Sequence, residues 1–372
     1  GFDCTAPSLH VGSLVQIMML RWFQKTGNKP IVLMGGGTTK IGDPSGKDSA
    51  RPLLTNDKIH ENQNSLRTVF QKYLKFGDAG NDAIMLDNAE WLEKLNYISF
   101  LRDFGSFFSI NKLINLESIK RRLEREQNLS FLEFNYSLLQ AFDYLKLNED
   151  YSCKLQMGGS DQWGNIITGV ELIRKKTSQA VYGLTSPLLT TSSGAKMGKT
   201  ASGAVWLNSD QLSDWDFWQY WRNTEDLDVI KFMKLFTELP MEEINRFEQL
   251  KGAEINQAKI VLANEVTKLC RSKEAADKIS VSSANVFNKK ESDETLPFVS
   301  IDDRQISLID ALRILNFVQT NGEARRLIRG NGAKINDNVI TDENYQLKME
   351  DYLNNSVKIS SGKKKHGLLK LS

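Results

Sequence analysis

The sequence reads Gly158-Gly159-Ser160-Asp161-Gln162-Trp163-Gly164-Asn165 where a short apolar segment ends and a helical pattern begins. Glycines between a strand and a helix let a ligand approach the backbone near the helix start, as in open α/β sheets. About thirty residues later comes Lys196-Met197-Gly198-Lys199-Thr200, a short loop with two lysines. Lysines in such a loop suit a chain of phosphates during group transfer. Together the two segments predict an α/β fold that performs adenylate chemistry.

The bulk composition limits the class of protein. With 372 residues the chain is too long for one compact core, so two or three domains are expected. Charged residues make up 25% of the chain but nearly cancel, at a net charge of +2, so any basic surface must be local. Cys4, Cys153 and Cys270 have no metal-site spacing and indicate a reducing compartment. No apolar run reaches the length of a membrane span, and we expect a soluble protein.

Strands and helices alternate in the first part of the chain. The predicted elements are a turn over 3–8, a helix over 8–25, strands over 29–34 and 83–87, a mostly helical stretch over 90–147, and a strand, glycine turn and helix over 153–175. This alternation is typical of a parallel, doubly wound sheet. We therefore predict a Rossmann-like α/β domain over residues 1–208.

The pattern changes after about Asn208. Residues 209–284 carry almost no strand pattern and open with a cluster of large aromatic side chains, so we predict an α-helical domain. A polar linker is predicted over 285–305. Helices over 307–315 and 321–329, with strands near 333–335, 357–359 and 368–371, predict a small α+β domain over 306–372.

Three polar residues share one face of the helix expected around residue 140. Tyr136, Gln140 and Asp143 are spaced i, i+4 and i+7, so their side chains line up along the helix. The opposite, core-facing stripe consists of Phe134, Leu138, Ala141 and Leu145. The pattern alone fits either an exposed polar face or a pocket that hydrogen-bonds a small polar molecule.

Further candidate ligand groups lie in turns. His10-Val11-Gly12 is predicted in the first turn of a helix with Thr5 upstream, where an imidazole and a hydroxyl can donate to anionic oxygens. Asp43, Lys47 and Arg51 fall in a glycine-rich connection after a strand, without the Walker A spacing. Each group taken alone also fits an ordinary surface turn. In combination and in this order they indicate a nucleotide site.

These motifs, in this order, resemble bacterial-type tyrosyl-tRNA synthetases, which are class I aminoacyl-tRNA synthetases, over essentially the whole chain. His10-Val11-Gly12-Ser13 corresponds to the HIGH signature and Lys196–Thr200 to the KMSKS signature. Residues 1–3, 42–47 and 158–165 also resemble family motifs. The segment Asn135–Asp143 is the most specific, because it resembles the tyrosine pocket that separates this family from other class I enzymes.

The resemblance implies a role for each matching residue. Asp143 is expected to accept a hydrogen bond from the phenol of L-tyrosine. The tyrosine ammonium group is expected to contact Asp43, Tyr136, Gln140 and Gln162. The ATP or adenylate ligands are expected to be Asp3, Gly12, Ser13, Gly159, Asp161 and Lys199. The groups expected to stabilise the phosphates during reaction are Thr5, His10, Lys47, Arg51, Lys196, Lys199 and Thr200.

The implied activity is tyrosine–tRNA ligation, in which L-tyrosine is activated with ATP and then transferred to tRNA(Tyr). Catalysis would be electrostatic and positional, with Mg²⁺ on the ATP phosphates and no protein metal cage. The helical domain would be of the anticodon-binding type, and residues 306–372 resemble an S4-type RNA-binding domain. Its basic edge comprises Arg325, Arg326, Arg329 and Lys334. The resemblance also implies a homodimer with its contact around residues 97–135, in the bacterial cytoplasm or alternatively the mitochondrial matrix.

Several positions depart from the family pattern. Ser13 stands where the second histidine of the HIGH signature usually sits, and Gly198 replaces the serine of KMSKS, which predicts a looser loop. The chain opens at Gly1 without a methionine, and a pocket tyrosine is expected just upstream. Two rival functions stay open. A tryptophan-specific synthetase is disfavoured by Asp143, and a non-catalytic RNA-binding protein on the same scaffold is disfavoured by His10 and the lysines.

Overall fold

The computed structural model describes residues 1–45, 53–200, 203–288, 296–302, 306–362 and 365–371. The chain divides into two compact units, Gly1–Gln211 and Leu212–Ser372. Within the described ranges, no helix combines the length and the apolar character needed to cross a bilayer.

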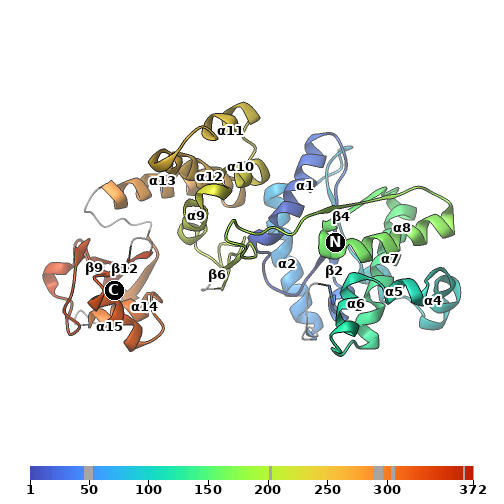
Figure 1. Cartoon of the computed structure of the whole chain (residues 1–372), viewed down its shortest axis with the longest axis horizontal. Helices are drawn as coiled ribbons and strands as arrows, with labels where there is room; N and C mark the ends of the chain where they lie inside the picture. The colour runs from blue at the N-terminus through green and yellow to red at the C-terminus, as the bar shows by residue number, and fades with distance from the viewer. Residues whose placement is uncertain (46–52, 201–202, 289–295, 303–305, 363–364, 372) are drawn as a thin grey trace. The chain divides into compact units, whose positions relative to one another are not determined.

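The first unit is built on parallel strands (Figure 1). β1 (Phe2–Asp3), β2 (Ile31–Gly35) and β3 (Ile84–Asp87) form one parallel sheet in the order β1-β2-β3. β4 (Leu155–Gly159) and β5 (Tyr182–Ser186) form a second parallel pair. Asp3 pairs with Gly35 and Met34 with Asp87, so the carboxyl ends of three strands meet at one edge. That edge is where open α/β sheets bind ligands, and the Rossmann-like prediction is confirmed.

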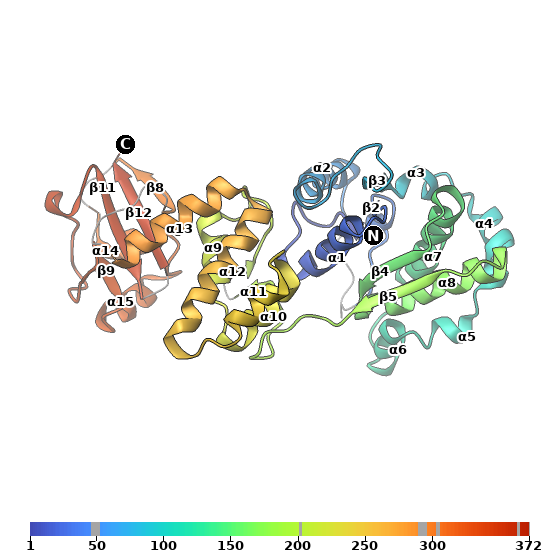
Figure 2. The same ribbon diagram turned by 90° about the horizontal axis from the view of Figure 1, so that it is seen from above.

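Helices pack against these strands. The long ones are α1 (Leu14–Lys25), α2 (Asn56–Tyr73), α7 (Phe131–Tyr151) and α8 (Trp163–Thr177). Figure 2 shows α7 and α8 beside β4 and β5. The predicted core stripe of α7 is confirmed, because Leu138, Ala141 and Leu145 are buried in one cluster with residues of α8. The shorter helices between β3 and α7 are α3 (Ala89–Leu92), α4 (Tyr97–Phe104), α5 (Ile110–Leu113) and α6 (Glu117–Glu124).

The start of α7 is fixed by a capping box. Ser130 Oγ accepts a hydrogen bond from the Glu133 backbone N–H (3.2 Å), and Glu133 Oε2 accepts one from the Ser130 N–H (3.2 Å). Arg122 Nη2 of α6 lies 2.9 Å from Glu133 Oε1, and both side chains are buried. The capping box and this ion pair together fix the residue at which α7 begins and the rotation of the helix about its axis.

The chain start differs from the prediction. Phe2–Asp3 is a strand, because it pairs with Met34 and Gly35, which lie too far along the sequence for a local pattern to reveal. The helix predicted from residue 8 begins only at Leu14, after a 3₁₀ turn over Val11–Ser13. His10 therefore precedes the helix, where its backbone forms a bridge with Trp206.

The second unit begins with helices, as predicted. These are α9 (Asp214–Arg222), α10 (Val229–Phe236), α11 (Met241–Phe247), α12 (Ile255–Cys270) and α13 (Lys273–Asn288). The aromatic cluster at its start is buried in α9, with Trp215, Phe217, Trp218 and Trp221 each at most 3% exposed.

A five-stranded sheet follows, in the order β10-β9-β11-β12-β8. Its elements are β8 (Phe298–Ile301), α14 (Leu308–Ile314), α15 (Asn321–Arg329), β9 (Ala333–Ile335), β10 (Asn338–Val339), β11 (Ser356–Ser361) and β12 (Lys365–Leu371). The segment predicted as a linker, 285–305, contains the end of α13 and all of β8. β8 forms because it pairs in parallel with β12, about seventy residues later.

Candidate active site

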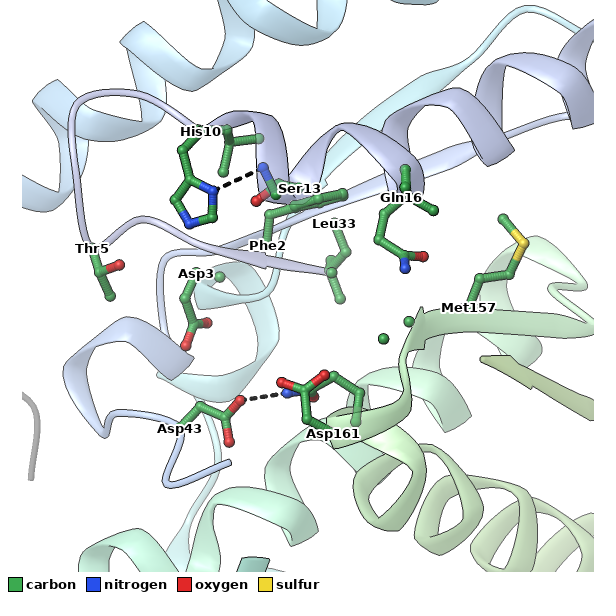
Figure 3. A pocket seen from close by; sticks show the side chains of 18 of the residues that line it. Phe2, Asp3, Thr5, His10, Ser13, Gln16, Leu33, Asp43, Met157 and Asp161 are labelled. Atoms are coloured by element: carbon green, nitrogen blue, oxygen red, sulfur yellow. Dashed lines mark hydrogen bonds between the residues drawn. The ribbon is translucent and has the colours of Figure 1, made fainter. Parts of the chain in front are cut away.

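A cavity of about 580 Å³ lies at the carboxyl ends of the strands of the first unit (Figure 3). Its wall contains most of the predicted site residues, namely Asp3, Thr5, His10, Gly12, Ser13, Asp43, Tyr136, Gln140, Asp143, Gly159, Asp161 and Gln162. Lys47 and Arg51, and the side chains of Lys199 and Thr200, lie outside the described residues. Lys196 is exposed and is not part of the wall. The structure thus gathers residues from distant turns into one chamber.

Asp143 is a buried carboxylate in the wall of this cavity. Its side chain is 2% exposed, and each carboxylate oxygen accepts a hydrogen bond. Asn88 Nδ2 donates to Asp143 Oδ2 (2.9 Å), and Trp91 Nε1 donates to Asp143 Oδ1 (2.7 Å). Burial raises the pKa of Asp143 to about 7, although these two donors oppose the shift. A carboxylate kept at this cost inside a cavity is a candidate for recognising a ligand hydroxyl.

Asn88 and Trp91 were not among the predicted site residues. Asn88 follows β3 directly, and its Oδ1 also accepts a hydrogen bond from the Gly37 backbone N–H (2.8 Å) in the turn after β2. This side chain therefore ties the glycine turn after β2 to Asp143 on α7. The signal that could have revealed it is its place at the carboxyl end of a predicted strand, which is the ligand-binding edge of such sheets.

Tyr136 lies one helical turn before Gln140 on the same face of α7. Its hydroxyl donates to Asp3 Oδ2 (3.0 Å), while Thr38 Oγ1 donates to Asp3 Oδ1 (2.8 Å). Burial, reinforced by the negative charge of Asp3, raises the pKa of Tyr136 well above its ordinary value, so the phenol stays protonated. Gln140 Nε2 donates to Gln156 Oε1 of β4 (3.3 Å). The pocket interpretation of this helix face is supported over the exposed-face alternative.

Asp43 and Gln162 meet across the cavity. Gln162 Nε2 donates to Asp43 Oδ2 (2.7 Å), as the dashed line in Figure 3 shows, and the Ser45 N–H donates to Asp43 Oδ1 (2.9 Å). Asn165 Nδ2 donates in turn to Gln162 Oε1 (3.1 Å). Asp43 is buried, so these donors keep its carboxylate compensated.

The glycine turn after β4 leaves the backbone open. A Cβ atom at Gly159 would lie only 2.5 Å from Asp161 Oδ1. Partial loss of solvent raises the pKa of Asp161, although the positive charge of Lys196 opposes this shift. A carboxylate beside bare backbone suits the two hydroxyls of a ribose.

His10 lies opposite Asp43 and Asp161 in the view of Figure 3. Its Nδ1 accepts a hydrogen bond from the Gly12 backbone N–H (3.0 Å). The neutral ring therefore carries its proton on Nε2 and can donate from that atom. The arrangement fits a group that binds an anionic oxygen.

The wall of the cavity is rich in carboxylates. Carboxylates of Asp3, Asp43, Asp143 and Asp161 line it, which favours a ligand with an ammonium group. No group of three or more metal-binding side chains occurs in the part of the chain that the structure describes.

The predicted basic edge of the second unit is exposed on α15. Arg325, Arg326 and Arg329 face solvent, whereas Ala324 and Ile328 on the other side of the helix are buried in the core of this sheet. Arg329 Nη2 donates to Glu343 Oε2 (3.1 Å), so part of this charge is already compensated. Lys334 of β9 is half-buried.

Similarity to known proteins agrees with this geometry. A family model described as tRNA synthetases class I (W and Y) matches residues 1–288. A tyrosine–tRNA ligase of Novosphingobium aromaticivorans is 56% identical over 370 residues, which cover 100% of this chain and 90% of the relative. One of Rickettsia conorii is 54% identical over 376 residues, covering 100% and 92%.

Solved structures show the same fold. A C-terminally truncated mitochondrial tyrosyl-tRNA synthetase of Aspergillus nidulans matches with a TM-score of 0.68 and 30% identity, over 77% of this chain and 84% of that one. A tyrosyl-tRNA synthetase of Archaeoglobus fulgidus, at a TM-score of 0.53 and 16% identity over 75% of this chain and 88% of that one, shares the fold alone. On the family match and the full-length relatives, the chain belongs to the class I tRNA synthetases of the tryptophan and tyrosine type.

Proposed function

We propose that this chain is a tyrosine–tRNA ligase, which activates L-tyrosine with ATP and transfers it to tRNA(Tyr). The observation that carries the proposal is the carboxylate of Asp143, 2% exposed and held by two donors in the cavity that Gly159 also lines. Full-length relatives at 54–56% identity are tyrosine–tRNA ligases, which supports it. Incubation with tyrosine, ATP and tRNA(Tyr) should form tyrosyl-tRNA, and the absence of charging by protein shown to be folded by circular dichroism would contradict the proposal.

In the proposed complex the tyrosine phenol donates a hydrogen bond to Asp143. The ammonium group is proposed to lie near the oxygens of Asp43, Tyr136, Gln140 and Gln162, all of which line the cavity. Phenylalanine would leave the buried carboxylate without the partner that offsets its burial. Sites of this kind reject the analogue that lacks the hydroxyl by a factor on the order of 10⁵, a general value for enzymes of this specificity and not a measurement on this chain.

The proposed reaction is in-line attack of the tyrosine carboxylate on the α-phosphorus of ATP, which releases pyrophosphate. Asp161 and the Gly159 backbone would hold the ribose, and Asp3 would lie beside the adenylate. His10 Nε2 and Thr5 would donate to the γ-phosphate as charge develops there. The chain supplies alignment and hydrogen bonds, and no side chain has to transfer a proton to the reacting atoms.

Positive charge for the departing pyrophosphate would come from the lysine loop, with Lys196, Lys199 and Thr200, and from Lys47 and Arg51. Mg²⁺ is proposed to enter on the phosphates of ATP, where it neutralises charge. Carboxylates such as Asp43 and Asp161 in the cavity wall support this arrangement, because they suit an ammonium group and the hydroxyls of a ribose.

The basic edge on α15 is proposed to contact the phosphate backbone of the tRNA. Replacing Arg326 and Arg329 by alanine is expected to raise the tRNA KM and to lower the salt dependence of binding by about one unit of log–log slope per lost contact. Tyrosine-dependent ATP–pyrophosphate exchange should stay unchanged. Arg313→Ala, an exposed arginine on the neighbouring α14, is the matched control. Equal tRNA kinetics in the double variant and the control would contradict this role.

A homodimer is proposed through the helices between β3 and the start of α7. Large apolar side chains are exposed there, namely Tyr97, Ile98, Leu101, Ile110, Ile114, Leu123, Phe131 and Leu132. So many exposed apolar residues in one segment indicate a protein interface. Phe131→Glu is expected to shift the mass measured by sedimentation equilibrium from dimer to monomer, while Leu227→Glu, at 85% exposure in the second unit, should leave it unchanged. A monomeric wild type would refute the proposed dimer.

The remaining assignments follow from the same function. Residues 1–208 are proposed as the catalytic domain, 209–284 as a helical domain that contacts the anticodon region, and the sheet from β8 onward as the S4-like RNA-binding domain. A tRNA charging enzyme of bacterial type is proposed to work in the cytoplasm, and fractionation of the source cells tests this placement.

A further inference from the structure

The lysine loop of the first unit rests on the turn that carries His10. The connection runs through Val205, whose backbone N–H donates to the Gly198 carbonyl (3.1 Å) and whose carbonyl accepts from the Val11 N–H (2.9 Å). The next pair, Leu207 N–H to the Leu9 carbonyl (2.8 Å), continues this backbone contact. The two signature segments, far apart in sequence, are therefore joined through one intervening strand-like stretch.

Gly198 of the lysine loop lies directly against the turn that carries His10. It is buried and has a left-handed backbone, with φ of +87°. A Cβ atom there would lie 2.9 Å from the Gly12 backbone nitrogen and 2.9 Å from His10 Nδ1. Side chains do not tolerate such distances to backbone, so only glycine fits both the space and the dihedral angle. The glycine that the KMSKS comparison suggested would loosen the loop instead permits tight packing.

The two atoms that Gly198 approaches, the Gly12 backbone nitrogen and His10 Nδ1, are hydrogen-bonded to each other. The Gly12 N–H donates to His10 Nδ1 (3.0 Å), and this bond fixes the ring so that Nε2 carries the proton. The loop also approaches Gly12 from Met197, whose carbonyl oxygen would lie 3.0 Å from a Cβ atom at Gly12. The seating of the lysine loop and the tautomer of His10 therefore depend on the same contact.

We propose that Gly198 is a positioning residue that couples the two phosphate-binding groups, the lysine loop and His10. Because Gly198 has no side chain, the loop packs directly on the His10–Gly12 hydrogen bond. The loop is therefore in place when His10 has the tautomer that donates from Nε2. The expected effect on the reaction rate rests on the proposed function. The expected effect on the tautomer of His10 does not, because it follows from the contact alone.

The kinetic test is Gly198→Ala in the full chain. We expect kcat for tyrosine-dependent ATP–pyrophosphate exchange to fall by at least about 10-fold, because misplacement of catalytic groups by fractions of an ångström is costly. The tyrosine KM should stay unchanged, since the tyrosine pocket is built on α7. Gly194→Ala is the matched control: Gly194 has nearly the same φ, +84°, but nothing within 4 Å of its Cβ position. It carries the same backbone penalty without the contact, and a change below about 3-fold is expected.

A readout independent of activity is the tautomer of His10. The chain has three histidines, His10, His60 and His366, so their ring nitrogens can be assigned by ¹⁵N NMR. In the wild type and in Gly194→Ala, His10 Nδ1 should appear as an unprotonated acceptor; in Gly198→Ala this signal should shift toward a mixture of tautomers. An unchanged His10 spectrum in Gly198→Ala, or equal kinetic losses in the two alanine variants, would overturn the proposal. If the tautomer shifts as expected but no variant shows exchange activity, the coupling stands and the proposed function fails.

Discussion

Asp143→Ala is expected to raise the tyrosine KM and to reduce discrimination against phenylalanine from its high value to about 10² or less. The wild-type cavity keeps a carboxylate in a place where burial raises its pKa to about 7. We propose that the phenol of bound tyrosine offsets that cost. Without the carboxylate the pocket selects its substrate by size alone. Pockets of that kind discriminate only weakly between substrates that differ by one hydroxyl group. The measurement is kcat/KM for tyrosine and phenylalanine in ATP–pyrophosphate exchange.

Two comparisons sharpen this test. Asp150→Ala removes an exposed carboxylate from the same helix and should leave the discrimination unchanged. The pH profile adds a second readout: the raised pKa means that Asp143 protonates as the pH falls through about 7, so wild-type kcat/KM for tyrosine should fall below that pH. The alanine variant should lack this inflection. Unaltered kinetics for both amino acids in Asp143→Ala would remove the basis for the tyrosine assignment.

His10→Ala is expected to lower kcat for exchange by roughly 10²–10³ with little change in the tyrosine KM. The Gly12 N–H donates to Nδ1, so in the neutral ring Nε2 carries the proton, and we propose that it donates toward the phosphates. A donor that acts mainly on charge developing in the transition state affects kcat more than ground-state binding. Steady-state exchange kinetics with tyrosine and ATP varied separately measure both constants.

Rescue and control variants distinguish chemistry from folding. His10→Gln keeps an N–H donor at a comparable reach and should recover part of the lost rate. His60→Ala removes an exposed histidine on α2, whose ring bonds only to neighbouring Gln63 among the contacts described, and should behave like the wild type. A His10→Ala enzyme with normal kcat would exclude this residue from phosphate stabilisation.

The parts of the site that share one helix were predictable from sequence. Tyr136, Gln140 and Asp143 lie on one face of α7, and the structure places all three in the cavity wall. The reason is that helical periodicity fixes which side chains align without any knowledge of the rest of the fold. The turns that carry His10, Asp43 and Gly159 were found as motifs, and the parallel sheet explains why they meet.

Features that depend on pairing between distant segments were not predictable in this way. Asn88 and Trp91 contact Asp143 because the chain that follows β3 lies beside α7. The sequence hints at Asn88 only by its place at the carboxyl end of a predicted strand, and no local pattern marks Trp91. The same holds for β8, which exists through its pairing with β12. The sequence predicts a loose loop at Gly198, because the contact of this glycine with the His10 turn cannot be seen along the chain. Lys47 and Arg51 lie outside the described residues, and their roles stay predictions.

Competition among tyrosine, phenylalanine and tryptophan in ATP–pyrophosphate exchange tests the central claim most directly. An ionisable carboxylate, Asp143, lines the cavity, and Asn88 and Trp91 donate hydrogen bonds to its two oxygens. We therefore expect exchange that depends on tyrosine, with phenylalanine disfavoured by several orders of magnitude and tryptophan inactive. Preferential exchange with tryptophan, or similar rates with phenylalanine and tyrosine, would contradict it.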